Sequence, residues 1–177
     1  MGWIRKFLFP EPLRPYILGG VAIILGLGLV FLFEAVDTNT TSMSPTIPEG
    51  ARLLVQKRFF TIRRHDIVTL TDPQNPGKGL VKRVIGLPGE EVRMWNGQIY
   101  IDDTPITEPY LDDERRGTHH FPVRPFAKPG VFVPGDHYFV LGDNRKVTRD
   151  SRTFGPVPRS LIDGKVQLTY WPRFKIF

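Results

Sequence analysis

The residues best suited to chemistry are two serines in a polar stretch that directly follows a long apolar run. This stretch, TNTTSMSPTIPEG over residues 38–50, contains Ser42, Ser44 and five other hydroxyl or amide side chains. A serine hydroxyl becomes a nucleophile when a neighbouring base removes its proton. The chain has no cysteine, which excludes a thiolate nucleophile, and it contains no HExxH, GxSxG or Walker pattern. The stretch is therefore either a linker or a site that takes its base from elsewhere.

The histidines are poor candidates for that base. His119 and His120 are neighbours in a polar segment, while His65 and His137 stand beside aspartates where strands are expected to begin. We expect solvated or capping roles for all four, and no metal site.

Lys82 is the alternative base, because it lies inside the apolar run GLVKRVIGLPGEE. Strand alternation places it on one face with Leu80 and Val84, so its amine shares apolar surroundings. At a free pKa of roughly 10.4, only about 0.04% of a lysine is neutral at pH 7, whereas a pKa near 8 leaves roughly 10% neutral. Burial that destabilises the ammonium by about 3 kcal/mol suffices for this change. Taken alone, the pattern is better explained by a lysine that extends its amine to solvent.

An apolar segment precedes the serines and predicts a membrane anchor. Residues 16–33 carry no charge, and as a helix they span roughly 27 Å, close to the hydrocarbon core of a bilayer. Cations precede the segment and acids follow it, namely Arg5, Lys6 and Arg14 before it and Glu34 and Asp37 after it. This bias predicts a cytoplasmic N-terminus at 1–15, a transmembrane helix at 16–34 and an extracytoplasmic domain at 35–177. A cleavable signal peptide is disfavoured, since the apolar run is long and no small-x-small pair ends it.

Beyond the anchor, short strands alternate with Pro- and Gly-containing turns, which predicts a mainly β fold with an antiparallel sheet. The expected strands are 51–57, 66–70, 79–86, 91–95, 97–102, 137–142 and 165–171. Asn96-Gly97 predicts a tight hairpin. Residues 105–134 are expected to form a long excursion or flap, and the aromatic tail 170–177 either a final strand or a contact with the membrane interface.

The net charge is +6, but no block of five or more Lys or Arg residues is present. An anionic membrane surface explains this charge more simply than nucleic acid, so we expect no nucleic-acid partner.

Four motifs in order resemble the type I signal peptidase family. They are SMSPTIPEG (42–50), RRHDIVTL (63–70), VKRVIGLPGEEV (81–92) and GDNRKVTRDSRTFGPVP (142–158). Together they cover the chain from the anchor to near its C-terminus.

The resemblance implies roles for individual residues. Ser42 matches the family's nucleophile and Lys82 its general base, while Ser44 occupies a variable position. Thr40 matches a hydroxyl that assists the backbone N–H of Ser42 in binding the oxyanion, and a plain linker residue is the alternative for it. Thr148 stands where the family usually has a serine that orients the lysine. The family also has an ion pair near its site, which Asp150 and Arg152 match; a surface pair that stabilises the fold is the alternative.

The resemblance further implies a membrane-anchored, cofactor-free serine endopeptidase of the plasma membrane, which removes signal peptides from exported preproteins. Substrates are expected to bind extended near Met43, Leu80 and Val81, with small side chains at positions -3 and -1. The expected partners are preproteins and membrane lipid, with a monomeric enzyme. The alternative from another class is a membrane-tethered β domain that binds a partner without catalysis. A Ser/Lys self-cleaving regulator is disfavoured, because the chain has no convincing scissile pair of small residues.

Overall fold

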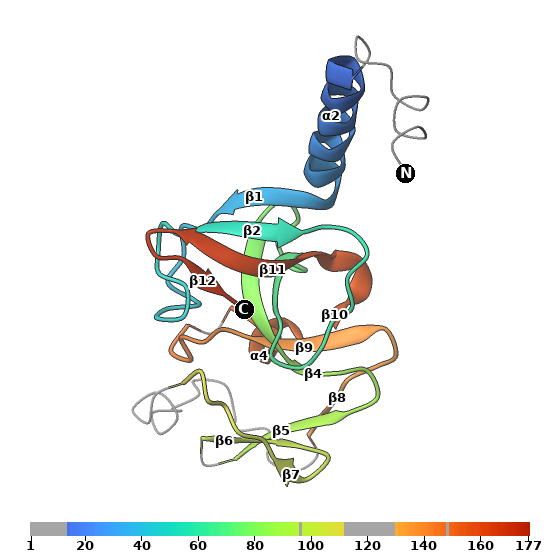
Figure 1. The fold of residues 1–177 in the computed structure, drawn as a ribbon. Coiled ribbons are helices and arrows are strands. Elements are labelled where there is room, and N and C mark those ends of the chain that lie inside the picture. The colour runs from blue at the N-terminus through green and yellow to red at the C-terminus, as the bar shows by residue number, and fades with distance from the viewer. Residues whose placement is uncertain (1–13, 96, 112–129, 148) are drawn as a thin grey trace, which may run out of the picture.

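The structure of the protein is a computed structural model, which describes residues 14–95, 97–111, 130–147 and 149–177. One long helix projects from a β domain, as Figure 1 shows. The N-terminal residues 1–13 and most of the predicted excursion, 112–129, lie outside the described residues, as does Thr148. The prediction of a flap at 105–134 therefore falls largely on residues that are not described.

Helix α2 (Arg14–Leu32) is the predicted apolar segment. It is long and apolar enough to cross a membrane, and none of the window Pro15–Leu32 is buried inside the described protein. The helix ends at Leu32, two residues before the predicted end of the transmembrane segment at Glu34. Phe33 and Glu34 instead begin strand β1 (Phe33–Asp37), because their backbone pairs with strand β2 at Gln56 and Val55.

The main sheet has eight strands and wraps around the core. Its order is β1, β2, β11, β3, β4, β9, β10, and β12 pairs with β11. Besides β1, its strands are β2 (Arg52–Gln56), β3 (Ile67–Thr71), β4 (Gly79–Gly86), β9 (His137–Leu141), β10 (Val157–Pro158), β11 (Ile162–Trp171) and β12 (Lys175–Ile176). All the pairings are antiparallel, which confirms the predicted fold class.

A smaller four-stranded sheet lies at the end of the domain opposite the helix (Figure 1). Its order is β7 (Thr104–Pro105), β6 (Gln98–Ile101), β5 (Glu91–Trp95), β8 (Val131–Phe132). Trp95 pairs with Gln98, so β5 and β6 form the hairpin predicted from Asn96-Gly97, and Gly97 has the positive φ of 78° that such a turn requires.

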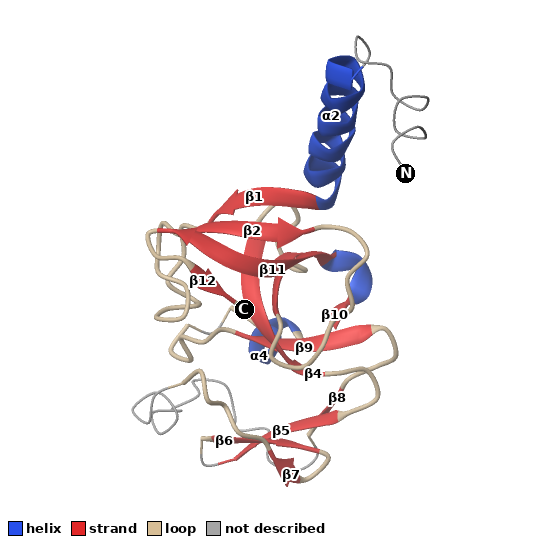
Figure 2. Ribbon diagram, in the orientation of Figure 1, coloured by secondary structure: helices blue, strands red, loops and turns tan. Residues whose placement is uncertain are grey.

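All seven predicted strands are present, and Figure 2 shows how strands dominate the domain. Strand β1 and the two-residue strands β7, β8 and β10 were not predicted from the sequence. The short helix α4 (Ser151–Phe154) and the 3-10 turn η2 (Arg159–Leu161) were also unpredicted. In the aromatic tail, β12 pairs with β11 and Phe177 packs against the core, as expected of a final strand.

Strand β4 runs through the centre of the domain and is buried on both faces. Every residue from Leu80 to Gly86 is buried, while only Gly79 at its start is exposed. Strands β3 and β9 flank it. The two cations of this strand, Lys82 and Arg83, are therefore both enclosed by protein.

Candidate active site

The structure brings Ser42 and Lys82 into direct contact, although 40 residues separate them. The Lys82 Nζ lies 2.6 Å from the Ser42 Oγ. Ser42 sits in the turn that follows β1, and Lys82 projects from the middle of β4, where its backbone pairs with Val68 of β3. Ser42 is 4% exposed and Lys82 only 1% exposed. The pair is thus shielded from bulk water, which strengthens the electrostatic interactions within it.

Burial changes the acid–base chemistry of this amine. It lowers the pKa of Lys82 from 10.5 to about 8, mainly because desolvation penalises the ammonium form. The negative charge of Asp150 acts in the opposite direction and Arg152 offsets part of that effect. Within the described part of the chain, Lys82 forms no ion pair with a carboxylate. A substantial fraction of the amine is therefore neutral near physiological pH and able to accept a proton.

Thr40 and the backbone of Ser42 supply polar groups around the hydroxyl. The Thr40 Oγ1 lies 3.0 Å from the Ser42 Oγ, so the two hydroxyls share a hydrogen bond. The Ser42 Oγ is also 3.5 Å from the Val81 carbonyl oxygen, a long contact. The backbone N–H of Ser42 has no hydrogen-bond acceptor among the residues that the structure covers. This N–H and the Thr40 hydroxyl are thus two polar groups next to the Ser42 Oγ.

The loop after β9 fixes the backbone of Ser42. The Asn144 N–H donates to the Ser42 carbonyl oxygen at 2.9 Å, and the Asn144 Nδ2 donates to the Thr41 carbonyl oxygen at 3.2 Å. Gly142 is required for this close approach, because a Cβ at this position would lie 2.6 Å from the Ser42 carbonyl oxygen. Gly142 and Asn144 therefore hold Ser42 directly.

Asp150 and Arg152 form a pair inside the protein, so the alternative of a surface pair is wrong. Arg152 donates from Nε to the Asp150 Oδ1 at 2.8 Å and from Nη2 to Oδ2 at 2.6 Å, and both side chains are buried. Asp150 also caps α4 and accepts a hydrogen bond from the Gly142 N–H at 3.1 Å. The pair thus anchors the loop that holds Ser42. The predicted role of Thr148 concerns a residue outside the described set.

Two further buried ion pairs were not predicted from the sequence. Arg83 forms a bidentate pair with Asp143, at 2.8 Å and 2.6 Å, next to Lys82 in the strand. Arg145 pairs with Glu108, and its Nε donates to the Gly142 carbonyl oxygen at 3.1 Å. The sequence did contain a signal for a partner of Arg83. Lys82 and Arg83 are adjacent in an otherwise apolar strand, so each face of β4 carries a cation. The carboxylate partners come from distant segments, and no local pattern indicates them.

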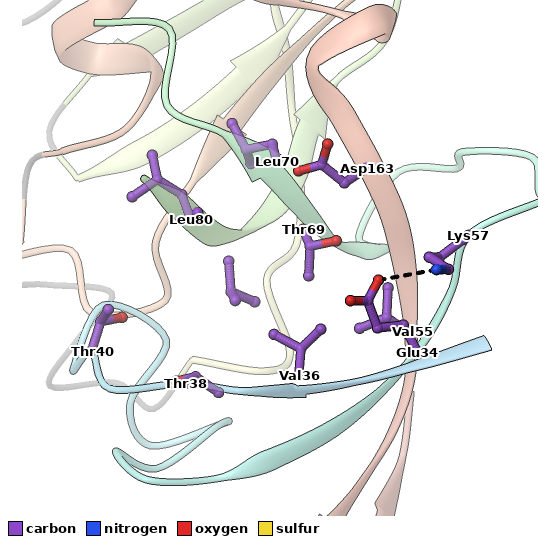
Figure 3. A pocket seen from close by; sticks show the side chains of 12 residues that line it. Glu34, Val36, Thr38, Thr40, Val55, Lys57, Thr69, Leu70, Leu80 and Asp163 are labelled. Carbon is purple, nitrogen blue, oxygen red and sulfur yellow. Dashed lines mark ion pairs between the residues drawn. The ribbon is translucent and has the colours of Figure 1, made fainter. Parts of the chain in front are cut away.

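A cleft of about 530 Å³ lies between β1 and the strands β3 and β4 (Figure 3). One side follows the extended segment 34–40, from which alternate side chains line the cleft: Glu34, Val36, Thr38 and Thr40. The other side includes Leu80 and Val81, both predicted to contact substrate. Thr40 connects the cleft to Ser42 through the shared hydrogen bond. Met43, the third residue predicted to contact substrate, does not line this cleft; its side chain packs in the core with Ile47 and Leu53.

Comparison with known proteins identifies the family of this fold and site. The family model described as "Signal peptidase, peptidase S26" matches residues 15–171. The chain belongs to this family. It is 37% identical to signal peptidase I of Bacillus licheniformis over an alignment of 158 residues, which covers 86% of this chain and 84% of that protein. It is also 37% identical over 163 residues to signal peptidase I V of Bacillus subtilis, with coverage of 85% and 94%.

A solved structure shares the fold. The crystal structure of a signal peptidase I from Enterococcus faecalis matches with a TM-score of 0.53 and 33% sequence identity. The match covers 61% of this chain and 98% of that structure. Membership of a family of serine peptidases makes this protein a hydrolase, and its apolar helix fits the single-pass anchor of a membrane enzyme.

Proposed function

We propose that this protein is a membrane-anchored endopeptidase that removes signal peptides from preproteins, with Ser42 as nucleophile and Lys82 as general base. The observation that carries the proposal is the buried amine of Lys82 at 2.6 Å from the Ser42 hydroxyl oxygen, with its pKa lowered to about 8. At that pKa about a tenth of the amine is neutral at pH 7, more than two hundred times the fraction of a free lysine.

The reaction follows from this geometry as an acyl transfer. Neutral Lys82 takes the proton of Ser42 while the Ser42 Oγ attacks the scissile carbonyl carbon. The resulting ammonium then gives its proton to the leaving amine, and the C–N bond breaks to leave an acyl-enzyme. Water hydrolyses this ester, with Lys82 again acting as the base. The oxyanion of each tetrahedral intermediate is stabilised by the Ser42 N–H, with Thr40 as a second donor.

The cleft gives the substrate a place to bind as an extended strand. Strand β1 ends the order of the main sheet, and within the described residues it pairs only with β2. A substrate segment that runs beside the segment 34–40 would lie against Val36 and Leu80, in apolar surroundings that suit small side chains at positions -3 and -1. Its scissile bond would then reach Ser42 past Thr40.

The membrane arrangement is part of the proposal. Residues 1–15 lie in the cytoplasm, helix α2 crosses the plasma membrane once, and the β domain stands outside the cell, as the charges that flank the helix favour. The cleavage site of a preprotein lies just outside its membrane-embedded apolar segment. Anchoring therefore brings enzyme and substrate to the same depth and raises their effective concentration. We propose a monomer.

Mutation of the pair tests the assignment. Ser42→Ala and Lys82→Met should each abolish cleavage of a preprotein in detergent or liposomes. Ser44→Ala serves as the matched control, because it removes a hydroxyl from the same turn and should leave activity intact. Normal cleavage by the Ser42→Ala protein would refute the proposal. Thr148→Ser should stay active and Thr148→Val should lose most activity, if the hydroxyl at this position orients Lys82.

Family membership and the amine–hydroxyl contact disfavour the alternative of a non-catalytic binding module. A module that only binds a partner needs no lysine amine sequestered from water, since such burial destabilises the fold.

A further inference from the structure

The loop that follows β2 is attached to the foot of helix α2. The Lys57 N–H donates to the Leu32 carbonyl oxygen at 2.8 Å, so the loop satisfies one of the acceptors that the helix end leaves free. The Gln56 Nε2 donates to the carbonyl oxygens of Arg58 and Phe59, at 2.9 Å and 3.3 Å. The Gln56 side chain is itself held by Gln167 of β11 at 2.8 Å. The loop therefore has a defined conformation relative to both the helix and the sheet.

Arg58 and Phe59 at the tip of this loop form an unusual surface. The Arg58 guanidinium lies over the ring of Phe31, at 4.2 Å from its centroid. Phe31 belongs to the last turn of the apolar helix and is 52% exposed. Phe59 is 86% exposed, the largest fraction among the exposed large apolar side chains of the described residues, and it has a positive φ of 56°. A non-glycine residue rarely adopts this conformation unless the surrounding structure holds it there.

The contact with Phe31 sets the depth of the loop in a membrane. If α2 spans the bilayer, its last turn ends at the boundary between hydrocarbon and headgroups. A guanidinium stacked on that turn is at the level of the lipid phosphates, where Arg residues anchor membrane proteins. Phe59, the next residue, then meets the interface instead of bulk water. Aromatic and basic residues side by side are the composition expected of such an interfacial contact.

We propose that Arg58 and Phe59 form a second membrane contact, in which the Phe59 ring enters the interface of the leaflet next to the β domain and Arg58 binds lipid phosphate. The inference rests on the proposed membrane-anchored function. The membrane contact would also affect the cleft. Lys57, the neighbour of Arg58, lines the cleft and forms an ion pair at 3.4 Å with Glu34, which lines it as well. The membrane contact would thus hold one end of the cleft at the bilayer surface and limit the tilt of the domain about its anchor.

Site-specific fluorescence in liposomes tests this contact directly. The chain has no cysteine, so single cysteines can carry an environment-sensitive label without background. The test position is Phe59→Cys. The matched control is Phe132→Cys, which replaces another exposed phenylalanine, in β8 of the small sheet at the end of the domain away from the helix (Figure 1). Leu25→Cys, in the middle of α2, reports whether the anchor itself is in the bilayer.

Full-length protein in phosphatidylcholine and phosphatidylglycerol vesicles with nitroxide-labelled lipids gives distinct outcomes. The proposal predicts a blue-shifted label at position 59 that headgroup-level nitroxides quench, an unquenched label at 132, and a label at 25 that deep nitroxides quench. A label at 59 that is as unquenched as that at 132, while position 25 is quenched, would overturn the membrane contact and leave the anchor intact. An unquenched label at 25 would overturn the anchor and this inference together. The label at 59 could also show a blue shift that nitroxide-labelled lipids do not quench and that changes with the protein-to-lipid ratio. This result would place a second copy of the chain over position 59 and would also overturn the proposal.

An activity measurement provides a second test. Phe59→Ser should lower cleavage of a membrane-embedded preprotein in liposomes by about fivefold, because the effective concentration at the bilayer falls, yet leave cleavage of a short peptide in detergent within about twofold of wild type. Phe132→Ser should change neither. Equal rates for the Phe59→Ser and wild-type proteins on the embedded preprotein would contradict the role assigned to this contact.

Discussion

Replacing Lys82 by Met should stabilise the protein at neutral pH even as it abolishes activity. Burial lowers the pKa of Lys82 from 10.5 to about 8, and this change corresponds to about 3 kcal/mol by which the buried ammonium destabilises the folded state at pH 7. Methionine has a similar shape and carries no charge, so the substitution removes this penalty. Loss of the hydrogen bond to Ser42 offsets it by about 1 kcal/mol.

The pH dependence separates the charge from the other effects of the substitution. Because the pKa is lower in the folded than in the unfolded protein, the folded state binds fewer protons between about pH 8 and pH 10.5. Wild type therefore gains stability relative to Lys82→Met as the pH rises through this window. The penalty of about 3 kcal/mol at pH 7 falls to about 1 kcal/mol at pH 10, while the lost hydrogen bond and the packing change contribute equally at both.

Denaturant unfolding of the β domain in detergent, at pH 7 and at pH 10, measures this difference for wild type and Lys82→Met. The control is Lys78→Met, which removes an exposed lysine just before β4 and so releases no buried charge. The expected result is a change of about 2 kcal/mol in the difference between the Lys82→Met and wild-type free energies of unfolding. A difference that is the same at both pH values would refute the claim that this amine is destabilised by burial.

Three further predictions follow from the same geometry. The value of kcat/KM on a peptide substrate should rise about tenfold per pH unit below pH 7.5 and level off above about pH 8.5, because Lys82 must be neutral to act as base; a profile that still rises at pH 10 would contradict the lowered pKa. Thr40→Val should lower kcat about a hundredfold while Thr40→Ser retains activity, and equal kcat for the Val variant would remove this hydroxyl, 3.0 Å from the Ser42 Oγ, from the mechanism. Asp143→Asn should lower the free energy of unfolding by about 3 kcal/mol, because it leaves the buried Arg83 without its counter-charge; an unchanged denaturant midpoint would contradict the importance of this pair.

Local patterns were sufficient to predict most of the fold. Alternating or continuous apolar residues between turn signals predicted seven of the eight strands that have four or more residues, and Asn96-Gly97 predicted the hairpin of the small sheet. Strand β1 was missed because it continues directly from the apolar helix and owes its extended form to pairing with β2, a non-local contact. The two-residue strands are too short to have a periodicity that a sequence reveals.

The candidate site shows the same division between local and non-local information. The apolar surroundings of Lys82 indicated a buried amine, but its proximity to Ser42 depended on the ordered motifs of the resembled family and not on spacing. The carboxylates that pair with Arg83 and Arg145 lie in distant segments, at Asp143 and Glu108, so the sequence could not indicate them. Met43, expected to contact substrate, packs in the core because the turn after Ser42 directs it inward.

The proposed role of Lys82 requires an amine that loses its proton near neutral pH, and NMR can titrate this amine directly. Wild-type protein labelled with ¹³C at the lysine Cε, in detergent, would give a resonance assignable to Lys82 by its absence from the spectrum of Lys82→Arg. This resonance should titrate with a midpoint near pH 8, as the lowered pKa requires. A midpoint above about pH 10, the value of a lysine in water, would contradict it.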